Sequence, residues 1–146
     1  MNGDRLLLDT VFIQALFNQR DRYHDRPADG PKNRAVELLP RPQAAAEVWI
    51  TEAVLTEIGN ALSAVNRCHA VQFIQQCYQT ANIRVVSVDT QLLTRTLQLY
   101  EARPDKTWGL TDCISFVVMQ ENGLIDAVTA DHHFVQAGYR ALMLNS

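Results

Sequence analysis

Short apolar runs that alternate with longer amphipathic stretches limit the possible fold of this chain more than any other feature. The runs at residues 6–8, 48–50, 83–88, 127–130 and 141–144 have the length and composition of β-strands. Strands that alternate with helices form parallel sheets whose two faces are both covered. We therefore predict an α/β fold, a three-layer α/β/α sandwich around a twisted, largely parallel central sheet.

The helical stretches are predicted from the spacing of apolar residues. They are expected at residues 11–17, 33–39, 51–62, 67–78, 90–102 and 111–122, with a single turn after residue 131. The stretch at 33–39 should be interrupted by Pro40 and Pro42, because proline breaks helices. The stretch at 111–122 is apolar around much of its circumference, which predicts a central, buried helix.

Two segments are predicted to be loops because they combine proline, glycine and closely spaced charges. Residues 20–31 should form a mobile loop, and residues 103–109 a shorter one. Basic residues between positions 20 and 34 form a weak basic patch, since neighbouring aspartates cancel part of their charge. This patch is a weak indication of RNA binding.

Length and charge narrow the possible functions. At 146 residues, of which 47% are hydrophobic, the chain suits one compact domain, residues 1–146, with one continuous core. Its formal net charge of -3 excludes a strong global attraction to phosphate backbones. Any affinity for nucleic acid must therefore be local, or carried by a bound metal ion.

The cysteines and the N-terminal segment indicate the cellular compartment. Cys68, Cys77 and Cys113 are widely spaced and have no companion metal-binding motif, which is typical of buried or half-buried thiols in a reducing cytosol. The first apolar run, residues 6–8, is too short for a signal peptide or a membrane span. We expect a soluble, cytoplasmic protein with no membrane contact.

Four carboxylates carry the functional hypothesis. Asp9 and Asp131 follow predicted strands, Asp112 begins a predicted helix, and Glu57 lies inside one. Ligands bind α/β sheets at the carboxyl ends of the strands, where these acids could face one crevice. Their mutual repulsion would be relieved only by cations or protons. Hard divalent ions such as Mg²⁺ favour oxygen ligands, and one or two of them can activate water toward a phosphate.

Helix capping is the competing explanation for each aspartate. Aspartate is a preferred N-cap and is favoured near the positive end of a helix dipole. Asp89 also lies between a strand and a helix, so position alone does not separate it from Asp9 or Asp131. Glu57 is different because capping does not apply in the middle of a helix. Its alternative is a solvated helix face.

Four short motifs contain these acids, in a fixed order along nearly the whole chain. They are LLDT at 7–10, ITEAVLTEI at 50–58, LTDCISF at 110–116 and VTADHHF at 128–134. This series resembles PIN domains, and within them the VapC-like toxins. The resemblance implies a PIN-like fold and a metal-dependent endoribonuclease. It also implies that Asp9, Glu57 and Asp112 bind Mg²⁺ or Mn²⁺, while Asp131 binds directly or through water.

The same resemblance implies a mechanism and partners. In PIN domains of this kind, water activated by the metal attacks the phosphorus of an RNA phosphodiester, and no covalent protein intermediate is needed. VapC-like toxins are paired with a small antitoxin that blocks the acidic crevice, and they commonly form homodimers. Whether the substrate is a transfer, ribosomal or messenger RNA stays open.

Several residues beside the acids have both a functional and a structural interpretation. Thr10, Thr111 and Thr129 adjoin three of the acids and could contact phosphate or orient ligands, or equally satisfy local backbone groups. Asp105 could approach the site, or pair with a basic neighbour in its own loop.

Histidine and tryptophan side chains near the third and fourth motifs are further candidates. His132 and His133 follow Asp131, but adjacent side chains diverge, so histidine ligation is the less favoured interpretation. Trp108 could stack on a base, although shielding its loop from water is the commoner function of such an aromatic residue.

Two alternatives to a PIN ribonuclease remain. The first is another Mg²⁺-dependent α/β phosphohydrolase, but an aspartyl-phosphate phosphatase would have a second aspartate two positions after its nucleophile, where this chain has Val11. The second is a non-catalytic module, either a receiver or a PIN fold that binds a partner. A receiver would need paired acids early and a lysine after a late strand, and neither is evident.

Overall fold

In the part of the chain that the structure describes, five parallel strands form one central sheet. The computed structural model describes residues 3–17 and 40–144. The strands are β1 (Arg5–Leu8), β2 (Glu47–Thr51), β3 (Ile83–Val86), β4 (Asp126–Val128) and β5 (Arg140–Ala141). Their spatial order is β3-β2-β1-β4-β5, and every pairing is parallel.

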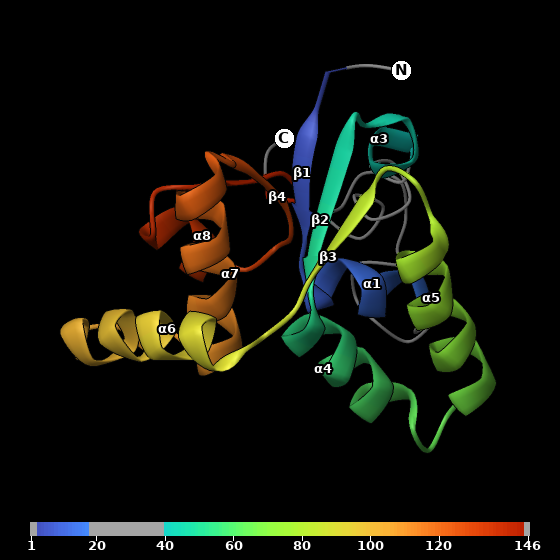
Figure 1. Cartoon of the computed structure of the whole chain (residues 1–146), viewed down its shortest axis with the longest axis horizontal. Helices are drawn as coiled ribbons and strands as arrows, with labels where there is room; N and C mark the ends of the chain where they lie inside the picture. Colours follow the sequence, from blue (N-terminus) through green and yellow to red (C-terminus); the bar gives the residue numbers. More distant parts are fainter. Residues whose placement is uncertain (1–2, 18–39, 145–146) are drawn as a thin grey trace.

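Helices cover both faces of this sheet, as Figure 1 shows. They are α1 (Thr10–Phe17), α3 (Pro40–Ala44), α4 (Glu52–Leu62), α5 (Arg67–Gln79), α6 (Thr90–Ala102), α7 (Leu110–Asn122) and α8 (His132–Gln136). Helices α1, α4 and α5 lie on one side of the sheet, and α6, α7 and α8 lie on the other (Figure 1). The predicted three-layer α/β/α sandwich is therefore confirmed.

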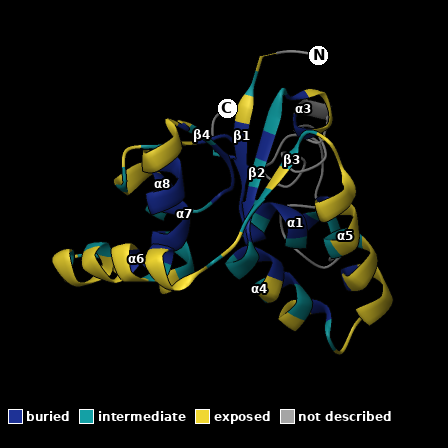
Figure 2. Cartoon of the chain, in the orientation of Figure 1, coloured by how far each residue is buried: buried dark blue, intermediate teal, exposed yellow. Residues whose placement is uncertain are grey.

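The central strand β1 contributes to two hydrophobic cores. Leu6 and Leu8 pack in the core beneath α1, α4 and α5, whereas Leu7 packs in the core beneath α7 and α8. Successive side chains of a strand point to opposite faces, so an uninterrupted apolar strand must be covered on both. All three leucines are buried, and Figure 2 shows most of β1 in the colour of buried residues, whereas β3 is intermediate to exposed.

The order of the strands reverses at β1. The chain builds β1, β2 and β3 side by side, and then returns to place β4 on the other side of β1. Ligands bind parallel sheets at such a switch point, outside the carboxyl ends of the two central strands. Asp9 follows β1 directly, and its backbone N–H donates to the carbonyl of Val128 at the end of β4 over 3.4 Å.

Helix α7 is the buried helix that the sequence predicts. Its residues from Cys113 to Met119 are all buried. The helix ends at Gly123, whose φ of 66° is left-handed and whose N–H donates to the carbonyl of Met119. A glycine adopts this conformation without the steric cost that a Cβ atom would add.

Four predictions about element boundaries are wrong. Pro40 and Pro42 are part of α3, where the sequence predicts an interruption; proline fits the first turn of a helix because the N–H that it lacks has no partner there. The strands predicted at 83–88 and 127–130 end earlier, at Val86 and Val128. The last strand is Arg140–Ala141 rather than 141–144, although Met143 N–H still donates to the Thr129 carbonyl.

Other expectations concern the termini, the loops and the cysteines. The mobile loop at 20–31, the basic patch at 20–34 and the helix at 33–39 lie outside the described residues. In the described part of the chain, no helix has the length and apolarity that a membrane span requires. All three cysteines are free, and the prediction of a buried or half-buried thiol is wrong for Cys68, which is exposed.

Candidate metal centre

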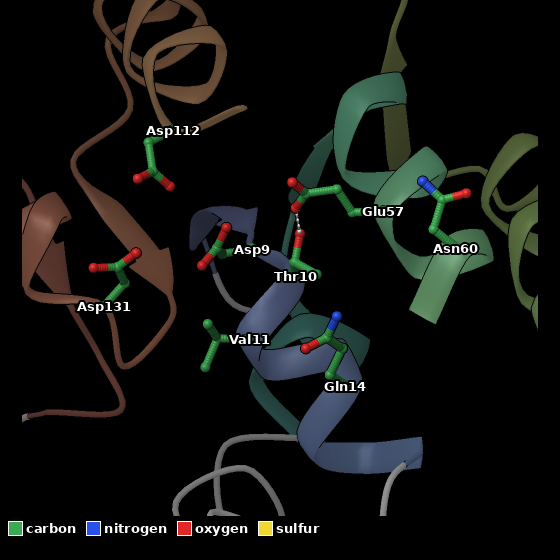
Figure 3. Close-up of a pocket in the computed structure, with 8 residues that line it drawn as sticks. All are labelled: Asp9, Thr10, Val11, Gln14, Glu57, Asn60, Asp112 and Asp131. Carbon is green, nitrogen blue, oxygen red and sulfur yellow. Dashed lines mark hydrogen bonds between the residues drawn. The ribbon is translucent and has the colours of Figure 1, made fainter. Parts of the chain in front are cut away.

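A cavity of about 390 Å³ lies at the carboxyl edge of the sheet. It is lined by the four predicted acids and four neighbours, namely Asp9, Glu57, Asp112, Asp131, Thr10, Val11, Gln14 and Asn60. Figure 3 shows Asp112 and Asp131 on one side of the cavity and Glu57 on the other, with Asp9 between them. Acids separated by more than 100 positions in the sequence therefore share one cavity.

Asp9 is the most deeply buried of the four acids, with 4% of its surface exposed. Its Oδ2 accepts a 2.7 Å hydrogen bond from the Thr129 hydroxyl. Burial raises the pKa of Asp9 from 3.8 to about 7, and the charges of Asp112 and Asp131 add to this rise against the effect of the Thr129 hydrogen bond. A bound cation would relieve both causes.

Asp112 lies in the first turn of α7. Its Oδ2 accepts a hydrogen bond from the backbone N–H of Gly109 over 3.3 Å, so the side chain also caps the helix. Burial raises the pKa of Asp112, and the charge of Asp131 raises it further, while a hydrogen bond with His133 lowers it. The Asp112 carboxylate therefore caps α7 and also lines the cavity.

Asp131 is the N-cap of α8. Its Oδ1 accepts from the backbone N–H of His133 over 2.9 Å, and its own N–H donates to the Thr129 hydroxyl oxygen over 3.0 Å. Because Thr129 also donates to Asp9, one buried threonine orients two acid-bearing segments.

Glu57 projects from the middle of α4 toward the cavity. Its Oε1 accepts a 2.8 Å hydrogen bond from the Thr10 hydroxyl at the start of α1 (Figure 3). The side chain is half-buried, flanked along the helix by buried Leu55 and Ile58. The structure therefore excludes a fully solvated helix face for Glu57.

His133 contacts two of the acids. Its Nδ1 lies 2.8 Å from Asp112 Oδ2 and 3.4 Å from Asp131 Oδ1. These three side chains offer ligand atoms that all lie within 4.8 Å of one another. The two adjacent histidines diverge as expected, since His132 is exposed and His133 is half-buried. Sequence reasoning did not favour His133 at the site.

Comparison with known proteins supports the fold. No protein-family model and no curated protein matches this sequence. Among solved structures, the chain resembles the VapC20 toxin of Mycobacterium tuberculosis, with a TM-score of 0.76 and 22% identity over 92% of this chain and 96% of that one. FitAcB from Neisseria gonorrhoeae matches with a TM-score of 0.61 and 14% identity, over 93% and 94% of the two chains. The chain has a PIN fold.

The PIN fold explains why acids from four motifs meet. Asp9 directly follows β1, and Asp131 lies shortly after β4. Helices α4 and α7 start near the same edge of the sheet, and they carry Glu57 and Asp112. The resemblance to VapC-like PIN domains is confirmed at the level of the fold.

Other candidate residues lie elsewhere. Asp105 is not part of the cavity lining; it pairs with Arg103 at 3.0 Å and with Lys106 at 4.0 Å. Trp108 is 7% exposed and donates from Nε1 to Gln136, so it shields its loop rather than offering a free face to a base. Thr111 is half-buried in the first turn of α7.

Two cavity residues were missed by the sequence analysis. Gln14 lies one helical turn after Thr10 on α1, and Asn60 lies one turn after Glu57 on α4. Residues three or four apart share a face of a helix. A polar side chain one turn beyond a candidate residue was therefore the signal that could have found both.

The donor set fits a hard divalent cation. The cavity offers four carboxylates, and no lysine or arginine is among the described residues that line it. Oxygen-rich, anionic sites of this kind suit Mg²⁺ and Mn²⁺.

Proposed function

We propose that this chain is a divalent-metal-dependent endoribonuclease that hydrolyses RNA phosphodiester bonds, and that it acts as the toxin of a VapBC-like pair. The observation that carries the proposal is the cavity at the switch point of the sheet, where four carboxylates gather around the buried Asp9. The likeness to VapC20, described as a toxin that cleaves the sarcin-ricin loop, supports the same chemistry.

In this proposal Asp9, Asp112 and Glu57 hold Mg²⁺ or Mn²⁺, and Asp131 binds directly or through water. A bound divalent cation lowers the pKa of water and neutralises charge on the phosphate. Thr129 keeps the carboxylate of Asp9 oriented toward the cavity, because its hydroxyl donates to Oδ2.

The cavity walls have their own functions in this proposal. The Thr10 hydroxyl donates a 2.8 Å hydrogen bond to Glu57. This bond restricts the conformations of the Glu57 side chain before the substrate binds, so less conformational freedom is lost on binding. Gln14 and Asn60 present amide groups that can hydrogen-bond to ribose and phosphate oxygens of the RNA. Thr111 lies beside Asp112 in the first turn of α7 but is not part of the cavity lining, so we assign it no contact with metal or phosphate.

The deciding experiment is cleavage of single-stranded and looped RNA by the purified chain. We expect cleavage with Mg²⁺ or Mn²⁺, none with a chelator, and loss of activity by at least about 100-fold in Asp9→Asn and Asp112→Asn. Asp105→Asn is the matched control, because Asp105 is outside the cavity and should keep full activity. Unchanged cleavage in folded Asp9→Asn and Asp112→Asn would contradict the proposed site.

The same assay separates the alternatives. A different Mg²⁺-dependent phosphohydrolase would release phosphate from a monoester such as p-nitrophenyl phosphate and leave an internal RNA linkage intact. A non-catalytic PIN module would bind RNA or protein without cutting either. Mapping the RNA ends after brief induction, with and without the adjacent gene, identifies the substrate.

The partners follow from the same proposal. We expect an antitoxin that covers the acidic cavity, a homodimer, and action in the cytoplasm on RNA. Light scattering of the purified chain measures the oligomeric state. Co-expression with the product of the adjacent gene should abolish RNA cleavage and yield a complex that survives gel filtration.

A further inference from the structure

His133 connects two acids that come from different helices. Asp112 belongs to α7, and Asp131 caps α8. The Nδ1 atom of His133 lies 2.8 Å from Asp112 Oδ2 and 3.4 Å from Asp131 Oδ1. A single ring nitrogen therefore faces two carboxylate oxygens.

Both nitrogens of the His133 ring have a polar partner. An ionised carboxylate only accepts hydrogen bonds, so the tautomer that carries its hydrogen on Nδ1 is the one that donates to Asp112. On the other side of the ring, Nε2 lies 3.2 Å from the hydroxyl of Thr107, in the loop that precedes α7. A hydroxyl both donates and accepts, so Thr107 can hydrogen-bond to Nε2. Both ring nitrogens are thus held.

This arrangement opposes the repulsion between the two acids. Asp131 raises the pKa of Asp112, whereas the hydrogen bond from His133 lowers it. The hydrogen bond from Nδ1 ties Asp112 to a ring that also lies 3.4 Å from Asp131 Oδ1, and so it limits the separation of the two carboxylates. In the structure, a carboxylate oxygen of each acid and a ring nitrogen of His133 all lie within 4.8 Å of one another.

We propose, on the basis of the proposed ribonuclease function, that His133 is a positioning residue: held by Thr107, it fixes Asp112 and Asp131 side by side so that both reach one divalent cation. Hydrogen-bond partners of metal ligands typically change metal affinity by about 10- to 100-fold when they are removed. His133 acts here through the carboxylates and not as a ligand.

The test measures Mn²⁺ affinity by calorimetry in the full chain. We expect His133→Ala to weaken Mn²⁺ binding by about 10- to 100-fold, and Thr107→Val to weaken it less. His133→Asn should restore much of the affinity, because its amide N–H can occupy the position of Nδ1. These variants keep the cap of α8, since the backbone N–H of residue 133 donates to Asp131. His132→Ala is the matched control and should bind Mn²⁺ like the unmodified chain, since His132 is exposed.

Spectroscopy distinguishes positioning from ligation. In the metal-free chain, ¹⁵N NMR should find His133 protonated at Nδ1. With Mn²⁺ bound, pulsed electron paramagnetic resonance should show no coupling from a directly coordinated ¹⁴N nucleus. A directly coordinated ¹⁴N, or unchanged affinity in His133→Ala, overturns the inference.

One further variant separates this inference from the proposed function. If Asp112→Asn no longer binds Mn²⁺ while His133→Ala binds it with unchanged affinity, the proposed metal site is supported and only the positioning function of His133 is wrong. If the unmodified chain binds no Mn²⁺, both the metal site and the inference are contradicted.

Discussion

Asp112 and Asp131 each cap a helix while they also face the cavity. A carboxylate has two oxygens and several lone pairs, so one backbone hydrogen bond leaves acceptor capacity for a cation. Asp89 caps α6 in the same way, accepting from Leu92 N–H over 2.8 Å, but it is not part of the cavity lining. Capping and metal binding are therefore compatible, which is why sequence position alone could not separate these acids.

The contrast with Asp89 yields a prediction at this scale. Asp89→Ala should lower the free energy of unfolding by about 1 kcal/mol, the usual cost of a lost N-cap. It should leave Mn²⁺ affinity and RNA cleavage unchanged, because Asp89 is not part of the cavity lining. Urea unfolding and calorimetry on the same preparation measure both effects. Weaker Mn²⁺ binding in Asp89→Ala would contradict the assignment.

The buried Asp9 predicts a dependence of stability on pH. Its pKa is about 7 in the folded chain against 3.8 ordinarily, so between these values the folded state keeps a proton that the unfolded state has released. The contribution of Asp9 to stability is therefore fully present below about pH 4 and is lost as the pH rises to about 7. The loss amounts to about 1.4 kcal/mol for each pH unit.

Asp9→Asn provides the comparison, since it cannot ionise. In chelator, we expect the free energy of unfolding of the unmodified chain to fall more steeply between about pH 5 and pH 7 than that of Asp9→Asn. The asparagine variant should consequently be the more stable of the two near pH 8. Parallel pH profiles for the two proteins would show that Asp9 has an ordinary pKa.

At the scale of elements, two glycines on neighbouring helices should respond oppositely to alanine. Gly59 lies inside α4, where an added Cβ would approach only Ile74 at 4.0 Å, so Gly59→Ala should stabilise the chain by about 0.5 to 1 kcal/mol. Gly123 has a φ of +66°, so Gly123→Ala should destabilise it by about 1 to 2 kcal/mol. Chemical denaturation of both variants tests the signs, and effects of the same sign would contradict the argument.

The elements themselves were predictable where the apolar pattern was long. Helix α7 follows from its closely spaced apolar residues, and β1 from three consecutive leucines. The ends of the elements were harder, because they depend on tertiary hydrogen bonds. The backbone N–H of Val88 donates to the Glu52 carboxylate instead of continuing β3, and no local pattern indicates such a contact.

For the whole molecule, the order of motifs predicted that the acids share one edge of the sheet, and the cavity lining contains all four. The local chemistry between them was not predictable. The contact between His133 and Asp112 joins residues 21 positions apart, and it depends on how α8 packs beside α7. Propensity and periodicity carry no information about that packing.

Binding of the cation should stabilise the entire fold. A ligand that binds only the folded state adds about 2.7 kcal/mol to the free energy of unfolding at 100 times its dissociation constant. We expect Mn²⁺ to raise the melting temperature of the unmodified chain, and to have little effect on Asp9→Asn or Asp112→Asn. A K⁺ salt at the same ionic strength is the control for non-specific salt effects. An equal rise in all three proteins would indicate that the stabilising cation binds outside the cavity.

The switch in strand order has a consequence for synthesis of the chain on the ribosome. Asp9 and Glu57 emerge early, but Thr129 and Asp131 belong to the segment that follows β4, on the far side of β1. A nascent chain that stops anywhere before residue 131 therefore has at most three of the four acids and lacks the α8 cap. The complete cavity can form only after the segment that contains Thr129 and Asp131 has been synthesised, so a translation product truncated before it would carry an incomplete site.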